Sequence, residues 1–84
     1  MSPDHLRILA QAFRDTFDLA ADAAVEELAY QGIAAWDSVG HMRLVAALET
    51  AFDLMLDTDD VIGMSDFAKA VEIVGRHLRG EATQ

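Results

Sequence analysis

The 84-residue sequence contains no cysteine, one proline, and only 6 lysine and arginine residues against 15 aspartate and glutamate residues. The absence of cysteine excludes a disulfide framework and a thiolate metal site. The shortage of basic side chains argues against nucleic acid as a partner, because phosphates are neutralised by lysine and arginine. It argues equally against docking on an anionic membrane surface. The expected partners are therefore neither nucleic acid nor membrane.

Long apolar runs are also missing. No stretch approaches 18 apolar residues, so no membrane insertion is expected. The start of the chain lacks the basic residues and apolar run of a signal peptide, and we expect a cytoplasmic protein. A hydrophobic content of 52% is too high for a disordered chain. The length suits a single domain over residues 1–84, with a frayed tail at about 81–84.

Negative charge is concentrated in the middle of the chain. Residues 15–68 hold 12 acids and one base, Arg43, for a net −11, whereas residues 1–14 and 69–84 each carry a net +1. We expect basic surfaces of partner proteins to meet this acidic segment.

Apolar spacing predicts two helices in the first two thirds of the chain. Ser2 can cap the first helix. Pro3 suits its first position, because a backbone N–H there would have no acceptor within the helix and proline has none. The second helix is expected to begin at Asp37 or Ser38 and to end near Asp53. The expected apolar stripes are Leu6, Leu9, Ala10, Phe13 and Phe17 in the first helix, and Val39, Met42, Val45, Leu48, Ala51 and Phe52, with Leu44 beside them, in the second.

The remaining segments complete an all-α pattern. Residues 18–36 have no clean periodicity and predict a long, partly ordered connection with a single turn of helix. Residues 57–60 can cap a short helix that ends before Gly63, and Ser65 can cap a last helix that Gly80 would end. That helix has an apolar stripe of Phe67, Val71, Val74 and Leu78. With no alternating strand pattern, we predict a small bundle of three main helices plus one short helix, with a long first connection.

Catalytic and metal-binding patterns are weak. Asp37, Ser38 and His41 superficially form a catalytic triad. In a triad the acid binds the imidazole nitrogen that faces away from the serine, and an oxyanion hole lies on the opposite side of the site. Three residues within one helical turn cannot easily meet both requirements. His5, His41 and His77 are scattered along the sequence, so no zinc site is expected. We therefore expect a protein without catalytic activity of its own and without a metal.

Ser38 is the most informative of the three serines in the sequence. It could be a simple helix cap. Asp37 can also fill that role, which would leave the Ser38 hydroxyl in the first helical turn and facing water. A phosphate attached there would lie at the positive end of the helix dipole, beside unpaired backbone N–H groups. Physical chemistry permits a phosphate ester at Ser38 without requiring one.

The stretch WDSVGHMRLVAALETAF, residues 36–52, resembles the modification site of acyl carrier proteins, which have Asp-Ser-Leu or Asp-Ser-Val at the start of their second helix. The resemblance continues through the acidic Asp59-Asp60-Val61 of the short helix and through Phe67, Val71 and Val74 of the last one. It covers essentially the whole chain, in the right order and at the right length.

This resemblance implies that Ser38 carries 4′-phosphopantetheine, transferred from coenzyme A by a phosphopantetheinyl transferase that Asp37 would contact. The arm would carry acyl groups as thioesters between enzymes of fatty-acid, polyketide or related specialised biosynthesis. Those acyl-charging and acyl-processing enzymes would bring basic docking patches to a monomeric carrier. The residues implied in partner binding are Val39, Met42, Arg43 and Glu49.

Several positions depart from the family pattern. Ala34-Ala35 stands where many members have Leu-Gly, and Arg43 and Thr50 stand where acids are common. The second helix is therefore less acidic than in a housekeeping carrier, which favours a specialised member with dedicated partner enzymes. An aminoacyl or peptidyl carrier remains an alternative, as does a helical interaction module that is never modified.

Overall fold

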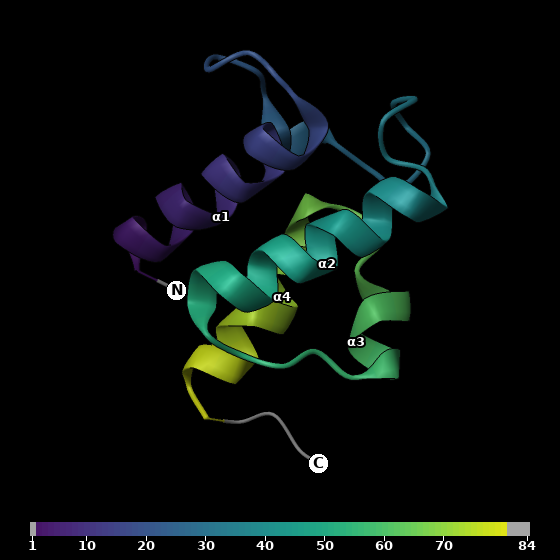
Figure 1. Cartoon of the computed structure of the whole chain (residues 1–84). Helices are drawn as coiled ribbons and strands as arrows, with labels where there is room; N and C mark the ends of the chain where they lie inside the picture. Colours follow the sequence, from purple (N-terminus) through teal and green to yellow (C-terminus); the bar gives the residue numbers. More distant parts are fainter. Residues whose placement is uncertain (1, 81–84) are drawn as a thin grey trace.

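A computed structural model of the chain describes residues 2–80. Its elements, in chain order, are α1 (Pro3–Phe17), the 3-10 turn η1 (Val25–Glu27), α2 (Ser38–Phe52), α3 (Thr58–Gly63) and α4 (Phe67–Leu78) (Figure 1). Within residues 2–80 there is no β-strand, and an isolated bridge joins Ala29 to Asp66. The prediction of three main helices plus a short one is confirmed. The predicted fraying at 81–84 lies outside the described residues.

Side-chain caps set the starts of α1 and α2. The Ser2 hydroxyl accepts the N–H of His5 at 3.1 Å, and Pro3 opens the helix, as predicted. Asp37 caps α2 by accepting the N–H of Gly40 at 2.8 Å. The start of α2 at Ser38 and its end at Phe52 therefore agree with the prediction.

The start of the last helix differs from the prediction. Asp66, not Ser65, caps α4, because its carboxylate accepts the N–H of Lys69 at 2.7 Å. Serine and aspartate are about equally good caps, and Asp66 has the extended backbone that a cap requires, with φ −156° and ψ 178°. Gly80 follows α4 with a φ of 73°, in agreement with its predicted role as the end of the helix.

The short helix is capped at Asp57 as predicted. The Asp57 carboxylate accepts the N–H of Asp60 at 2.8 Å, and the Asp60 carboxylate reaches back to the N–H of Asp57 at 3.5 Å. Together these bonds form a capping box. The helix includes Gly63 and is thus one residue longer than expected.

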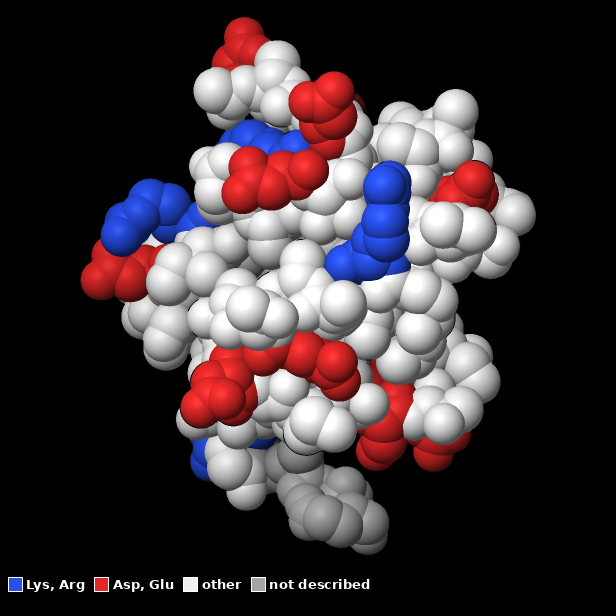
Figure 2. Space-filling view, viewed as in Figure 1, with Lys and Arg blue, Asp and Glu red and all other residues white. Residues whose placement is uncertain are grey.

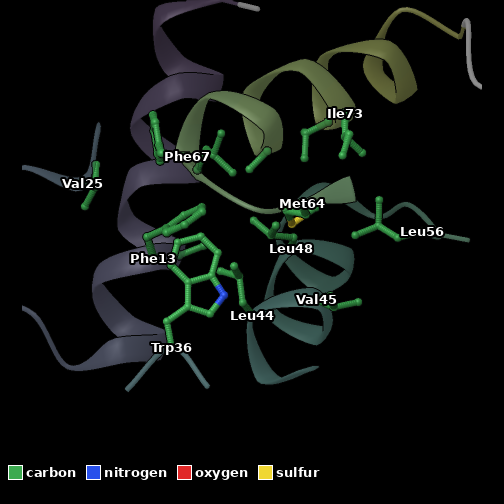
Figure 3. Close-up of a cluster of buried hydrophobic side chains, with 14 of the residues drawn as sticks. Phe13, Val25, Trp36, Leu44, Val45, Leu48, Leu56, Met64, Phe67 and Ile73 are labelled. Atoms are coloured by element: carbon green, nitrogen blue, oxygen red, sulfur yellow. The ribbon is translucent and has the colours of Figure 1, made fainter. Parts of the chain in front are cut away.

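An aromatic cluster lies at the centre of the bundle, where α1 and α2 run side by side (Figures 1 and 3). The rings of Phe13 and Trp36 are fully buried and meet edge to face at 5.4 Å, and Phe67 of α4 meets Phe13 at 5.1 Å. Edge-to-face pairs add stability beyond the apolar area that they bury. Other core residues are Leu9, Ala12, Phe17, Val25, Leu44, Val45, Leu48, Leu56, Met64, Ala70, Ile73 and Val74.

The predicted apolar stripes are only partly buried. α2 packs on the core through Gly40, Leu44, Val45 and Leu48, so Val45 and Leu48 of the predicted stripe are buried as expected, and the buried face is rotated from the rest of the stripe toward Leu44. Apolar residues occur on both sides of α2, and spacing alone could not show which side faces α1. The stripe residues that are exposed are Leu6, Val39, Met42, Ala51 and Leu78. None of the described helices is long and apolar enough to cross a membrane.

The long connection is anchored at several points. It contains the single helical turn expected there, η1, whose Val25 is buried. The N–H of Tyr30 donates to the carbonyl of Ser65 at 2.8 Å, and the N–H of Phe67 donates to the carbonyl of Leu28 at 3.2 Å. These bonds tie the connection to the start of α4 and hold the segment that leads into α2.

Candidate functional site

Ser38 is the first residue of α2 and is exposed. Asp37 occupies the capping position, so the Ser38 hydroxyl is not needed for that role. The N–H groups of Ser38 and Val39 are the first two of the helix and have no acceptor within it. The same end of the helix carries a partial positive charge. A phosphate ester at Ser38 would therefore find both hydrogen-bond donors and a favourable field.

A cavity of about 310 Å³ opens beside Ser38, between α2, α3 and the connection that precedes α2. Its volume is at the small end of the range for ligand pockets. Most of its wall is apolar, and the hydroxyls of Ser38, Ser65 and Tyr30 belong to residues that line it. The full lining is Tyr30, Ser38, His41, Met42, Val61, Ile62, Met64 and Ser65. A group attached to Ser38 would start at this cavity.

His41 lines the cavity and makes two short contacts with other residues. The indole Nε1–H of Trp36 donates to His41 Nδ1 at 2.9 Å, and His41 Nε2 lies 2.7 Å from the carbonyl oxygen of Val61. An indole N–H can only donate and a carbonyl oxygen can only accept, so the proton of the neutral imidazole is assigned to Nε2. Both ring nitrogens of His41 are thus engaged away from Ser38.

Two of the predicted partner-binding residues of α2, Val39 and Met42, lie next to Ser38 on the side opposite the buried Leu44 and Leu48. Arg43 lies on a different flank, because 3.6 residues per turn place it about 140° around the helix from Ser38. Val39 is 67% exposed and Met42 is 55% exposed, which leaves a substantial apolar surface next to Ser38.

Glu49 has a structural contact that sequence reasoning missed. Its Oε2 accepts the N–H of Leu56 at 2.9 Å and so holds the segment that follows α2 against the helix. Glu49 is half-buried, in contrast to the exposed Arg43. Within residues 2–80, Arg43 forms no ion pair. It lines a second, open cavity of about 630 Å³ between α1 and α2, together with Asp15 and Thr50.

Charged side chains do not cover the surface evenly. On the face shown in Figure 2, acidic side chains lie in several separate groups with uncharged surface between them. Among the described residues, no group of three or more histidine, cysteine, aspartate or glutamate side chains could hold a metal ion.

Six of the eight residues that line the cavity were not predicted as site residues: Tyr30, His41, Val61, Ile62, Met64 and Ser65. Apart from His41, they belong to the connection before α2 or to the chain at and just after α3, and no periodic pattern connects them to Ser38. Met64 lies at the same cavity and is fully buried. Folding, not a local motif, brings these side chains together.

Comparison with protein-family models, with curated proteins and with solved structures gives no match for this chain. Its function is therefore inferred from the site itself and from the sequence around Ser38.

Proposed function

We propose that this protein is a carrier whose Ser38 bears a covalent 4′-phosphopantetheine arm. The arm supplies a thiol on which acyl groups are carried as thioesters. One observation supports this most strongly: Ser38 is exposed at the start of α2, already relieved of capping by Asp37, and lines an apolar cavity. The resemblance of residues 36–52 to the acyl-carrier modification site points to the same group.

The residues around Ser38 fit such an arm. Its phosphate would be held by the free N–H groups at the start of α2, which Asp37 keeps in place by capping the helix. The cavity beside Ser38 would shield an apolar cargo from water. The chain itself then makes and breaks no bonds in the cargo, and a separate phosphopantetheinyl transferase attaches the arm.

The exposed side of α2 is the proposed contact surface for partner enzymes. Val39 and Met42 offer apolar area next to the arm, and the net negative charge of residues 15–68 suits partners with basic docking patches. Arg43 interrupts that acidic character, which favours dedicated partners in a fatty-acid, polyketide or related specialised pathway. We propose that the carrier acts as a monomer in the cytoplasm.

Intact mass tests the proposal directly. The unmodified protein is incubated with coenzyme A and a broad-specificity phosphopantetheinyl transferase, alongside Ser38→Ala and Ser65→Ala. Ser65 is the matched control, because it is also exposed at the same cavity. We expect one phosphopantetheinyl increment on the wild type and on Ser65→Ala, and none on Ser38→Ala. An unmodified wild type, or an increment that survives Ser38→Ala, would overturn the proposal in favour of an unmodified interaction module.

The apolar lining favours acyl cargo over an amino acid. Four of the cavity's lining residues, Met42, Val61, Ile62 and Met64, are apolar, and among residues 2–80 no carboxylate lines the cavity to pair with an amino group. The competing aminoacyl or peptidyl carrier would be charged by an adenylation enzyme for amino acids. We expect the modified protein to be charged by an acyl ligase, and exclusive charging with an amino acid would support the alternative.

A further inference from the structure

The short helix α3 contributes no buried side chain of its own to the core. Val61 is half-buried and Ile62 is 74% exposed. Val61 packs against the core, and two histidines from other helices add polar contacts. His41 of α2 contacts the carbonyl oxygen of Val61 at 2.7 Å, and His77 of α4 contacts the Asp60 carboxylate at 2.8 Å. The His41 contact joins α3 to α2 across the cavity, whereas the His77 contact joins α3 to α4.

The contact from His41 is anchored in the core. Trp36 is fully buried, and its indole ring stacks on Phe17 at 5.3 Å and on His41 at 6.1 Å. Because the Trp36 N–H donates to His41 Nδ1, the imidazole is fixed with its Nε2–H directed at Val61. Trp36 and His41 thus connect the core to α3 through two hydrogen bonds between rigid groups.

Residues of α3 form part of the wall of the cavity beside Ser38. Val61 and Ile62 line it from α3, and Ser38 and Met42 line it from α2. His41 belongs to the same lining and bridges the two helices. His77 lies outside this lining and holds α3 from α4. A shift of α3 away from α2 would therefore widen the cavity, and the His41 contact opposes that shift.

We propose that His41 is a positioning residue that holds α3 as a wall of the cavity and thereby limits the length of the alkyl or acyl chain that the cavity accepts. That an acyl cargo occupies the cavity rests on the proposed carrier function. The control of cavity size by His41 does not rest on it and can be measured without the phosphopantetheine arm.

Two substitutions separate the two bonds of His41. In His41→Gln the side-chain amide can take the place of Nε2 and donate to Val61, whereas in His41→Asn the shorter amide keeps an acceptor near Trp36 and loses Val61. His77→Asn is the matched control, because it removes the other histidine bond of α3 without touching the cavity.

Amide hydrogen exchange in the unmodified protein measures the hold on α3. For Val61, Ile62 and Gly63 we expect exchange about 2- to 12-fold faster in His41→Asn, the factor that one hydrogen bond represents. We expect His41→Gln to restore slow exchange, which a role in packing alone would not predict. Equal rates in the wild type and His41→Asn would overturn the proposal.

Cavity size is measured with linked alkyl chains. The sequence contains no cysteine, so Ser38→Cys creates a unique attachment site for alkyl methanethiosulfonates of increasing length. In Ser38→Cys with His41 intact, we expect the methyl chemical shifts of Met64 and Ile62 to change with each longer alkyl chain up to a limiting length and to stay constant beyond it. Adding His41→Asn should raise this limiting length, whereas adding His41→Gln or His77→Asn should leave it unchanged.

An unchanged limit in His41→Asn, or an equal extension in His77→Asn, would overturn the proposal. These readouts are independent of the transferase assay. Failure of Ser38 modification would reject the carrier function while leaving the result on His41 intact. Conversely, a normal phosphopantetheinyl increment with an unchanged chain-length limit would reject only the role of His41.

Discussion

Gly40 faces the backbone carbonyl of Ala35 so closely that a Cβ on residue 40 would overlap the carbonyl oxygen. The same Cβ would lie 3.3 Å from the ring of Phe17. The first turn of α2 can therefore pack directly against the end of the connection, which places Trp36 in the core and Asp37 at the cap. The position of Ser38 thus depends on the absence of a side chain two residues later.

Gly40→Ala is accordingly expected to lower the free energy of unfolding by about 1–3 kcal/mol, the usual cost of forcing extra atoms into a packed site. The clash is with backbone, so a change of side-chain rotamer cannot relieve it. Urea denaturation measures the effect. Gly63→Ala is the control, since its Cβ would make only an ordinary contact at 3.7 Å with Ile73. An unaffected Gly40→Ala variant would show that the connection shifts freely.

Phe13→Ala is expected to lower the free energy of unfolding by about 3–5 kcal/mol. Phe13 is fully buried and meets the rings of Phe17, Trp36 and Phe67. Leu6→Ala, in the same helix, is expected to change stability by less than about 1 kcal/mol, because Leu6 is 38% exposed. Thermal or urea unfolding compares the two, and similar losses would contradict the burial pattern of α1.

Asp37 combines a structural role with a proposed partner contact, and two substitutions separate them. Asp37→Ala removes the cap on Gly40 and should cost about 0.5–2 kcal/mol of stability. Asp37→Asn keeps a capping oxygen but loses the charge. We expect Asp37→Asn to unfold like the wild type and yet to be modified more slowly by the transferase. Equal modification rates for Asp37→Asn and the wild type would restrict Asp37 to capping.

Glu49 is expected to support the segment after α2. Glu49→Ala removes the acceptor of the Leu56 N–H and should lower the free energy of unfolding by about 1.5 kcal/mol. Glu49→Gln retains an acceptor oxygen at that position and should recover most of this loss. If Glu49 also contacts basic partners, Glu49→Gln will bind them more weakly at unchanged stability, as binding assays at low salt would reveal.

Arg43 and Thr50 are proposed to make this carrier specific for its own partners. Both are exposed on α2 and line the open cavity between α1 and α2. We expect the double substitution Arg43→Glu and Thr50→Glu to improve turnover of the acyl-loaded protein by a housekeeping ketosynthase. Stability should change little, since Arg43 has no ion pair within residues 2–80. If housekeeping and dedicated enzymes turn over the wild type and the double variant at equal rates, Arg43 and Thr50 do not determine partner specificity.

Local signals in the sequence were sufficient for the helices and most of their ends. Ser2, Asp37 and Asp57 are caps because their side-chain oxygens reach the N–H three residues ahead, which requires no distant contact. The choice between Ser65 and Asp66 was missed, since adjacent residues of similar capping preference differ only in the backbone angles that the surrounding fold imposes.

The sequence by itself determined an acidic, all-α chain with a serine behind a capping aspartate at the start of its second main helix. Only the tertiary structure decided that Val39 and Met42 face outward, because α2 turns its Leu44 side toward the core. It also decided that His41 bridges Trp36 to Val61 and that Tyr30 and Ser65 meet Ser38 at one cavity. Helix caps act within one turn of the chain, whereas contacts between helices depend on how whole faces pack.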